Sequence, residues 1–313
     1  MRNKSIDVLR VLCAFLIVCI HIPFNIIGGG YYVALTRIGV PIFLMISGYY
    51  YKNDKAKRQI KKTAILFIEA NLLYCAWRIF YGLISGSFPA LNFESLIKFV
   101  LLNESPFSGH LWYLGAILYT LVVVYLFDKA GVKKLLYWMA PVLIIGDLVL
   151  GKYSLLVFGK EYSYLLVRNW LFTGIPFFSI GMLMREKKVR IGSWGIPVFI
   201  FATLLERFLL VNNNVNAVRD QYISTTFLAI SVFSFALEYK GEVNDKLAKI
   251  GCDYSNWIYI IHPLFITLFS FIIKRIGMDK LWGYVGPMVV FFSSLLFVAI
   301  VSETRKKLIK TVS

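Results

Sequence analysis

Ten stretches of mostly apolar residues, each long enough to cross a membrane, constrain the fold of this chain more than any other feature. A membrane-spanning helix needs about 20 such residues, because each residue advances about 1.5 Å through roughly 30 Å of hydrocarbon. We therefore predict an all-α protein, a polytopic membrane helical bundle with about ten transmembrane helices. The predicted spans are residues 6–28, 33–51, 60–84, 110–128, 134–151, 164–184, 192–211, 221–239, 254–273 and 281–301.

Composition excludes the main alternatives. Of the 313 residues, 58% are hydrophobic and only 16% are charged, whereas a soluble domain is roughly half apolar and about a quarter charged. This excess excludes a disordered chain, a coiled coil and a standard cytosolic enzyme. The four cysteines show no paired spacing, so neither a disulfide framework nor a zinc site is expected. We expect a single transmembrane domain over residues 1–313, with no soluble domain, in the plasma membrane.

The distribution of basic residues predicts the orientation. Of the 34 Lys and Arg residues, 22 fall in the termini and loops of one side or at the adjoining span ends, seven on the other side and five deeper within spans. Cytoplasmic loops are rich in Lys and Arg, so both termini are predicted to be cytoplasmic, and the net charge of +17 needs no nucleic acid to explain it. Lys274, Arg275 and Lys280 lie on the unexpected side, which leaves open a re-entrant pair for the last two spans. The outer segment 93–102 is predicted to be an amphipathic helix in the membrane interface.

Arg10 and His21 stand out because polar side chains inside a membrane cost free energy and often serve function. They are eleven residues apart, which returns to within about 20° on a helix and rises about 16 Å. One face of the first helix therefore carries a cation at its cytoplasmic end and an imidazole in its outer half. Alternatively, Arg10 extends to the lipid phosphates and His21 is a hydrogen-bonded packing residue. The shared face, followed by Pro23, favours a common pocket.

Three further arginines lie in the outer parts of predicted spans: Arg37, Arg78 and Arg168. Together they suggest a cationic outer vestibule for an anionic or sugar-like acceptor, although packing among interfacial aromatics explains single cases. Glu69, in the middle of the third span, either neutralises one of these cations or orients His21.

The chain has three histidines, His21, His110 and His262. None has the spacing of a metal ligand to another histidine, cysteine or carboxylate, so no metal site is expected. Polar imidazoles in or beside spans favour general acid–base chemistry instead.

Four local patterns together resemble the acyltransferase-three family of bacterial membrane proteins. Span two reads R-I-G-V-P-I-F-L-M-I-S-G-Y and is similar to the family's R-x-x-V-P-x-F-F-x-x-S-G stretch. The patterns are Ser5–Arg10 followed by His21, Arg37–Tyr49, His110–Leu114, and Gly251–Ser255 leading to Tyr259–Pro263. Their order and spacing run from residue 5 to about residue 265 and fit the topology predicted from charge.

The resemblance implies an O-acyltransferase. In that family an acyl group, usually acetyl, passes from cytoplasmic acyl-CoA to a hydroxyl of an extracytoplasmic acceptor, such as a cell-surface glycan or a lipid-linked sugar. Acetyl-CoA is then the donor substrate, and no bound cofactor is expected. A separate extracytoplasmic transferase is a further expected partner, because some members carry an additional soluble domain that completes the transfer.

The same resemblance assigns roles to residues. The expected catalytic residues are His21, Arg10 and Arg37, with His21 accepting the proton of the acceptor hydroxyl. Arg10, on the cytoplasmic side where phosphates arrive, is expected to bind the donor together with the conserved Ser47–Gly48 pair. The expected acceptor-binding residues are His110, Trp112, Tyr113, Glu69, Arg78 and Arg168.

The chain also resembles the membrane half of the membrane-bound serine racemases linked to glycopeptide resistance. Because that half is associated with serine supply, a small-solute transporter of the serine type is the alternative function. Racemase activity itself is not expected without a racemase domain. A transporter often shows two similar halves with interrupted helices, and the sequence has no such repeat.

Overall fold

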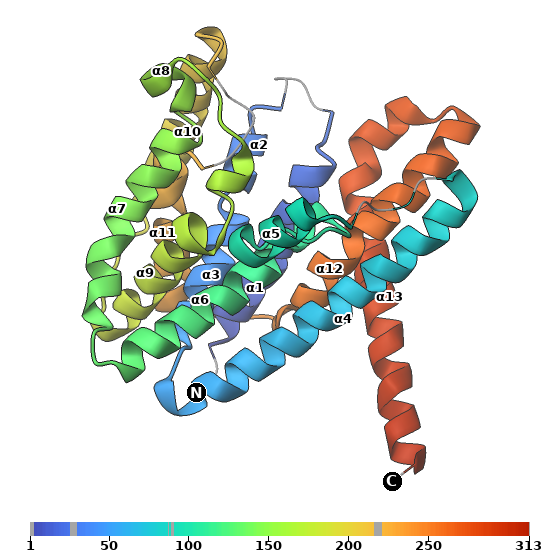
Figure 1. Ribbon diagram of the computed structural model, residues 1–313, viewed down its shortest axis with the longest axis horizontal. Helices are drawn as coiled ribbons and strands as arrows, with labels where there is room; N and C mark the ends of the chain where they lie inside the picture. Colours follow the sequence, from blue (N-terminus) through green and yellow to red (C-terminus); the bar gives the residue numbers. More distant parts are fainter. Residues whose placement is uncertain (1–2, 26–29, 87, 89–90, 216–220, 313) are drawn as a thin grey trace. The chain divides into compact units, whose positions relative to one another are not determined.

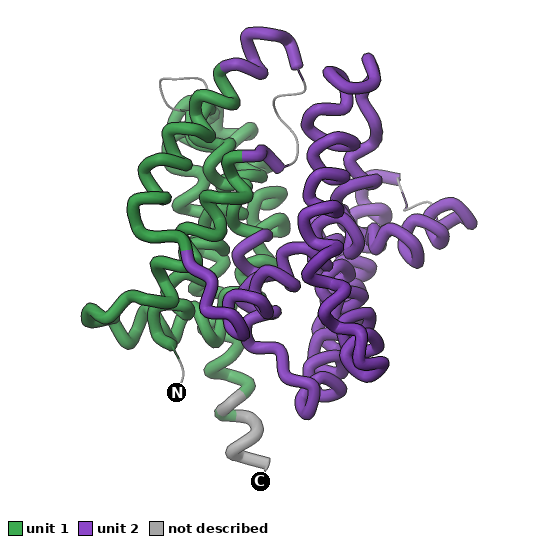
Figure 2. Tube along the Cα trace, turned by 90° about the vertical axis from the view of Figure 1, so that its left-hand side faces the viewer, with its two compact units in different colours: residues 1–40, 191–208, 224–313 green, residues 41–190, 209–223 purple. Residues whose placement is uncertain are grey.

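The computed structural model describes residues 3–25, 30–86, 88, 91–215 and 221–312. The described part of the chain is helical, with no strand, which confirms the all-α prediction (Figure 1). The chain divides into two compact units, each built from segments far apart in sequence (Figure 2). Unit 1 comprises residues 1–40, 191–208 and 224–313, and unit 2 comprises residues 41–190 and 209–223.

Unit 1 is built from the two ends of the chain and one internal segment. Its helices are α1 (Lys4–His21), α2 (Val33–Thr36), α10 (Gly195–Asn212), α11 (Ile223–Glu238), α12 (Asp245–Ile276) and α13 (Asp279–Val312). The last residues of α10 and the first residue of α11 are assigned to unit 2.

Unit 2 is built mainly from the central part of the chain. Its α-helices are α3 (Gly39–Tyr49), α4 (Asn53–Ser85), α5 (Phe93–Leu102), α6 (Trp112–Lys129), α7 (Lys134–Leu150), α8 (Ser154–Phe158) and α9 (Ile175–Glu186). It also contains the short helices η1 (Gly109–Leu111) and η2 (Tyr164–Leu166) and the π-helical turn η3 (Trp170–Gly174).

Helices occur at the positions of all ten predicted spans, and segment 93–102 is a helix, α5, as predicted, whereas its place in the membrane interface stays a prediction. In the described residues, five helices are long and apolar enough to cross a membrane by length and composition: 53–85, 109–129, 195–212, 245–276 and 279–305. The chain is therefore a helical membrane protein, whereas the count of ten spans stays a prediction. The first predicted span reached residue 28, of which residues 26–28 lie outside the described part.

Two predicted spans are not regular α-helix throughout. The span 33–51 is an apolar helical segment with a turn at residues 37–38 between α2 and α3, and the span 164–184 is regular α-helix only from Ile175 onward. Each later helix carries a proline in its first turn, Pro41 in α3 and Pro176 in α9. Proline is tolerated there because the first helical N–H groups have no intrahelical partner, but it cannot continue a preceding helix.

In unit 1, α1 and α12 pack closely and run parallel. A side chain at Gly251 would overlap the carbonyl oxygen of Asp7, so the two backbones touch at that point. Further along both helices, the rings of His21 and His262 lie 5.1 Å apart. Because residue numbers rise together along this contact, the two helices point in the same direction. α13 runs in the opposite direction, because Gly286 lies against Ile22 at the end of α1, whereas Phe291, further along α13, contacts Phe15 at 5.4 Å earlier on α1.

In unit 2, glycines allow α3 and α9 to approach at backbone distance. A side chain at Gly48 would overlap the carbonyl group of Phe178, and one at Gly181 would overlap that of Met45. Small residues at such contacts are typical of membrane helices, which gain stability from close packing rather than from exclusion of water.

Polar contacts hold the cytoplasmic end of unit 2, as oriented by the charge argument. The carboxylate of Glu186, at the end of α9, lies 2.8 Å from Lys133 Nζ and accepts a 2.7 Å hydrogen bond from the Tyr137 hydroxyl. The Tyr51 hydroxyl donates to Asp128 at 3.2 Å. These contacts join the end of α9 to the start of α7, and the segment between α3 and α4 to the end of α6.

Candidate functional site

The first group of candidate residues lies on α1 in unit 1. Arg10 is half-buried, and its Nε lies 4.0 Å from Oδ1 of Asp7, one turn earlier. Asp7 is itself buried, with 4% of its surface exposed. The sequence analysis did not identify Asp7, although the spacing of three residues on one helix is typical of an ion pair. The cation in the first half of α1 is therefore partly compensated by a carboxylate of its own helix.

At the other end of α1, His21 lies against a second histidine. His21 is the last residue of α1 and is exposed, whereas His262 on α12 is fully buried. Their ring planes are inclined by 45° at a centroid distance of 5.1 Å. The sequence favours acid–base chemistry for His262 as for the other two histidines, but it does not predict this contact with His21.

The hydrogen bond of His262 defines its tautomer. Nδ1 of His262 lies 2.7 Å from the carbonyl oxygen of Tyr259, one turn earlier on α12. A carbonyl oxygen only accepts, so Nδ1 carries the proton, and in the neutral ring the lone pair is on Nε2. The backbone thus fixes which nitrogen of this buried imidazole acts as a base or acceptor.

Arg37 also belongs to unit 1. It follows the last residue of α2, which packs against α1, and its side chain is half-buried. Gly39, two residues later, approaches the Cys13 carbonyl oxygen closely enough that a side chain there would lie 3.2 Å away. Arg37 is therefore held in an irregular segment beside α1 rather than within a continuous helix.

The predicted donor residues Ser47 and Gly48 lie in α3 of unit 2. The Ser47 hydroxyl donates to the Phe43 carbonyl oxygen at 2.9 Å, within its own helix. Gly48 forms the close contact with Phe178 described above. The structure gives this pair a role in helix packing, and its role toward acyl-CoA stays a prediction.

A polar cavity of 410 Å³ lies in unit 2, beside the outer ends of the predicted spans. Arg78 of α4 lines it, together with the Glu94–Lys98 ion pair of α5, whose charged atoms are 2.6 Å apart. Burial raises the pKa of the Glu104 carboxyl above its ordinary value, against the opposing influence of Lys98. Glu104, Ser105 and Ser108 complete the polar lining.

Other predicted acceptor-binding residues surround this cavity. His110 is buried behind it, with Nδ1 2.7 Å from the Ser108 hydroxyl and its ring 4.8 Å from that of Tyr74. The guanidinium of Arg168 lies 4.7 Å from the centre of the Tyr164 ring, which lines the cavity. Arg168 lies in the irregular segment between η2 and η3, whereas the sequence placed it inside a membrane-spanning helix.

Trp112 and Tyr113 begin α6 on the same side of unit 2. The side-chain amide of Asn103 donates to the Trp112 carbonyl oxygen at 2.8 Å and accepts from the Trp170 backbone N–H at 2.9 Å. Tyr113 is buried, with its ring 6.0 Å from that of Phe43. Asn103 therefore joins α6 and η3 behind the cavity, a role that the sequence analysis did not identify.

Within unit 1 the structure groups Arg10, His21 and Arg37 on or beside α1, and within unit 2 it groups Arg78, His110, Trp112 and Arg168 around the polar cavity. Glu69, predicted to orient His21 or to neutralise an arginine, is exposed on α4 of unit 2. In the described part of the chain, no group of three His, Cys, Asp or Glu side chains is arranged to hold a metal ion.

The fold and these residues define a class: a helical membrane protein with a pair of imidazoles in contact between two parallel helices, and a polar cavity in a separate unit. The chain matches the family described as the acyltransferase domain over residues 3–303, and it belongs to that family. The family resemblance is thereby confirmed, and it indicates a membrane acyltransferase.

Two curated relatives are similar to this chain. A serine/alanine racemase of Enterococcus gallinarum is 26% identical over 307 residues, which cover 88% of this chain and 43% of the relative. An amino-acid racemase of Enterococcus faecalis is 25% identical over 315 residues, which cover 89% of this chain and 43% of the relative. The chain thus spans less than half the length of these relatives. No solved structure matches it.

Proposed function

We propose that this chain is an O-acyltransferase of the plasma membrane, which moves an acetyl group from cytoplasmic acetyl-CoA to a hydroxyl of an extracytoplasmic glycan or lipid-linked sugar. The observation that carries the proposal is the pairing of His21 with His262 on the two parallel helices α1 and α12. An exposed imidazole beside a buried one with a fixed tautomer suits proton transfer at a reacting hydroxyl.

In the proposed step, the acceptor hydroxyl oxygen attacks the carbonyl carbon of the thioester. The new C–O bond forms as the C–S bond breaks, and the hydroxyl proton passes to the imidazole of His21 and then to the sulfur of CoA. Arg37 would stabilise the negative charge that develops on the carbonyl oxygen. The buried ring of His262 would hold the His21 ring in a productive orientation.

On the donor side, Arg10 would bind a CoA phosphate, because guanidinium groups bind phosphate with paired, charge-assisted hydrogen bonds. Its neighbour Asp7 limits the net positive charge, so phosphate binding at this point also needs other cations of the cytoplasmic side. Ser47 and Gly48 remain the proposed further donor residues. A separate extracytoplasmic transferase is a further proposed partner if the acetyl group is relayed.

The test uses inside-out vesicles, in which the cytoplasmic face meets added acetyl-CoA carrying a labelled acetyl group. We expect the label to enter the lipid or glycan fraction, and His21→Ala to reduce this incorporation by 10²–10⁴-fold, roughly the contribution of a general base. Leu12→Ala is the matched control, because Leu12 is an exposed residue of the same helix. Normal transfer by the His21→Ala chain would refute the proposed mechanism.

Transport is the second candidate function, because the names of both relatives concern amino acids. In this case the bundle would carry a small amino acid such as serine across the membrane without acetyl-CoA. Saturable uptake of labelled serine into vesicles, unchanged by acetyl-CoA and without acetyl transfer, would favour transport over the acyltransferase.

A further inference from the structure

Beside the polar cavity of unit 2 lies a second hollow of different chemistry. It has a volume of 490 Å³ and is lined mainly by apolar side chains of α5 and the segment before it, including Leu91, Phe93, Leu96 and Phe99. The two hollows share Asn92, Ser95, Pro106 and Phe107, so they adjoin along α5.

The helix between the two hollows is firmly held. The ring of Phe99 stacks on that of Phe67 at 5.6 Å, and its carbonyl oxygen accepts from the Tyr119 hydroxyl at 3.2 Å. The indole N–H of Trp170 donates to the Leu101 carbonyl oxygen at 2.9 Å. α5 nevertheless buries none of its residues, and its large apolar side chains are exposed, as expected of a helix in the membrane interface.

The charges of the polar cavity indicate what it would bind. Lys98 is neutralised by Glu94. Arg78, near the end of a predicted span, makes no ion pair among the described residues. A guanidinium without a carboxylate partner favours phosphate. The Ser105 and Ser108 hydroxyls and the Glu104 carboxyl offer hydrogen bonds to the hydroxyl groups of a polar head.

We propose that these adjoining hollows form one two-part site for an anionic amphiphile, with a phosphate-bearing, hydroxylated head in the polar cavity and an apolar chain along α5. This inference rests on the proposed function, because it specifies the acceptor as a membrane-anchored molecule rather than a soluble sugar. One wall joins the two parts, since the Ser105 hydroxyl in the polar cavity donates to Oδ1 of Asn71 in the apolar hollow at 2.7 Å.

The test measures binding without acyl-CoA, so it is independent of whether the chain transfers acetyl groups. The full chain is placed in phosphatidylcholine nanodiscs, and three labelled probes are compared: lysophosphatidic acid, the monoacylglycerol of the same chain length, and glycerol 3-phosphate. We expect lysophosphatidic acid to bind at least about tenfold more tightly than either fragment, because only it fills both parts of the site.

Two substitutions separate the two parts. Arg78→Gln should weaken lysophosphatidic acid binding about tenfold, the effect of losing a hydrogen-bonded charge, without changing the binding of monoacylglycerol. Leu96→Gln should weaken the binding of both chain-bearing probes without affecting glycerol 3-phosphate. Val100→Gln is the matched control on α5, because Val100 is exposed and lines neither hollow.

Several outcomes would overturn the inference. Equal binding of lysophosphatidic acid and glycerol 3-phosphate would show a phosphate site without use of the apolar hollow. Equal binding of lysophosphatidic acid and monoacylglycerol, or an unchanged Arg78→Gln chain, would show that membrane acyl chains fill the hollow without recognition of the head.

Discussion

The two imidazoles of unit 1 differ in surroundings, which separates their expected roles. His21 is exposed and meets the acceptor in the proposed mechanism, whereas His262 is fully buried and hydrogen-bonded to its own helix. We expect His262→Asn to retain the fold, because an asparagine amide can reproduce the hydrogen bond from Nδ1 to the Tyr259 carbonyl oxygen. The same substitution removes the ring that packs against His21.

For the His262→Asn chain we expect acetyl transfer to fall about 10- to 100-fold, with unchanged binding of acetyl-CoA, because positioning contributes to the chemical step rather than to donor binding. The pH profile of transfer should also change, since the ring beside the proposed general base, His21, has been removed. An unchanged pH profile together with full activity would assign His262 to packing alone.

Only some residues of the candidate site on α1 could be predicted from the sequence. Arg10 and His21 share one helix, so helical geometry places them on one face without knowledge of the fold. His262 is more than 200 positions further along the chain, and its contact with His21 depends on how two distant helices pack. Asp7 was not predicted for a different reason: a carboxylate near the predicted end of a span is expected to be exposed to solvent, yet Asp7 is buried.

Among the elements, the contact of α1 with α12 depends on one glycine. Gly251→Ala would place a methyl group on the carbonyl oxygen of Asp7, a backbone atom that cannot rotate away. We expect a loss of about 1–3 kcal/mol in stability, the usual cost of overpacking, and a reduced yield of acetyl transfer because His262 moves relative to His21. Thermal unfolding of the purified chain measures the first effect. Asn256→Ala, at an exposed position of α12, should leave the midpoint unchanged.

The polar contacts of Glu186 give unit 2 a pH-dependent element. Burial by itself would raise the pKa of this carboxyl, but hydrogen bonds from Lys133 and Tyr137 and the nearby Arg185 hold it below its ordinary value. The pKa is thus lower in the folded state than in the unfolded state. The stabilisation is therefore complete above the unfolded-state pKa and is lost as pH falls through the folded-state pKa.

We therefore expect Glu186→Gln to lower the thermal midpoint at neutral pH and to lose this difference progressively on acidification below the ordinary carboxyl pKa. The effect is small, because the Glu186 side chain is 28% exposed and solvent screens the ion pair. Unfolding of both chains across this pH range measures it. A constant difference at every pH would show that the carboxylate charge is not involved.

The helix boundaries show what hydrophobic runs can and cannot predict. A continuous run predicts α7 to within one residue, because it has turn residues at both ends. The same criterion joined α2 to α3 and extended α9 through an irregular segment, since the few polar residues there, Arg37, Arg168 and Asn169, do not end the surrounding apolar runs. Pro41 and Pro176 were the sequence signals for a new helix start at α3 and α9. Asn169, which caps η3, was a weaker signal for the irregular segment before α9.

For the whole molecule, the parallel course of α1 and α12 bears on the orientation. Two helices whose N-terminal ends both lie in the cytoplasm must run parallel, as the predicted first and ninth spans would. The exposed ion pair between Lys4 and Asp245, 2.5 Å apart, joins the starts of these two helices on one side of unit 1. The orientation itself remains a prediction from charge, and the three cations near the α12–α13 turn are its weakest point.

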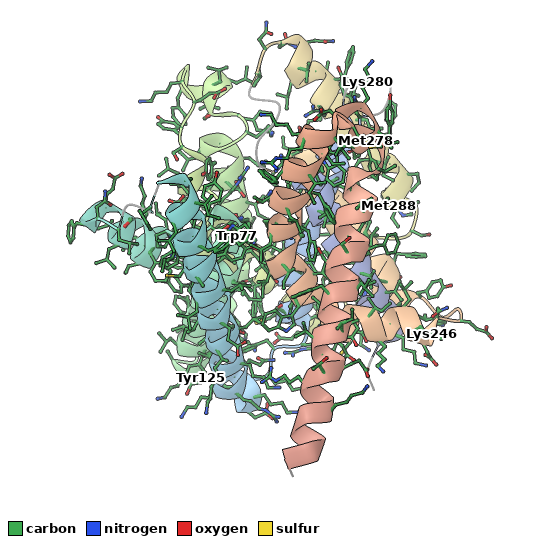
Figure 3. All side chains as sticks on the ribbon, turned by 90° about the vertical axis from the view of Figure 1, so that its right-hand side faces the viewer. Trp77, Tyr125, Lys246, Met278, Lys280 and Met288 are labelled. Atoms are coloured by element: carbon green, nitrogen blue, oxygen red, sulfur yellow. The ribbon has the colours of Figure 1, made fainter. Side chains whose placement is uncertain are left out.

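Single cysteines at the two ends of α12 test this orientation. Figure 3 shows Lys246 near the start of α12, and Met278 and Lys280 at the turn into α13. α12 has 32 residues and so is about 48 Å long, more than the roughly 30 Å of hydrocarbon. We therefore expect Lys280→Cys to react with a membrane-impermeant maleimide on intact cells and Lys246→Cys to react only after permeabilisation.

The unsubstituted chain is the control for this labelling, because Cys75 and Cys252 are only half-buried. The re-entrant alternative makes the opposite prediction for one position. If α12 and α13 entered and left the membrane on the cytoplasmic side, the turn would not reach the outer surface, and Lys280→Cys would stay unlabelled until the cells were permeabilised. Labelling of Lys246→Cys on intact cells would instead reverse the whole topology, and with it the side on which acetyl-CoA would have to meet Arg10.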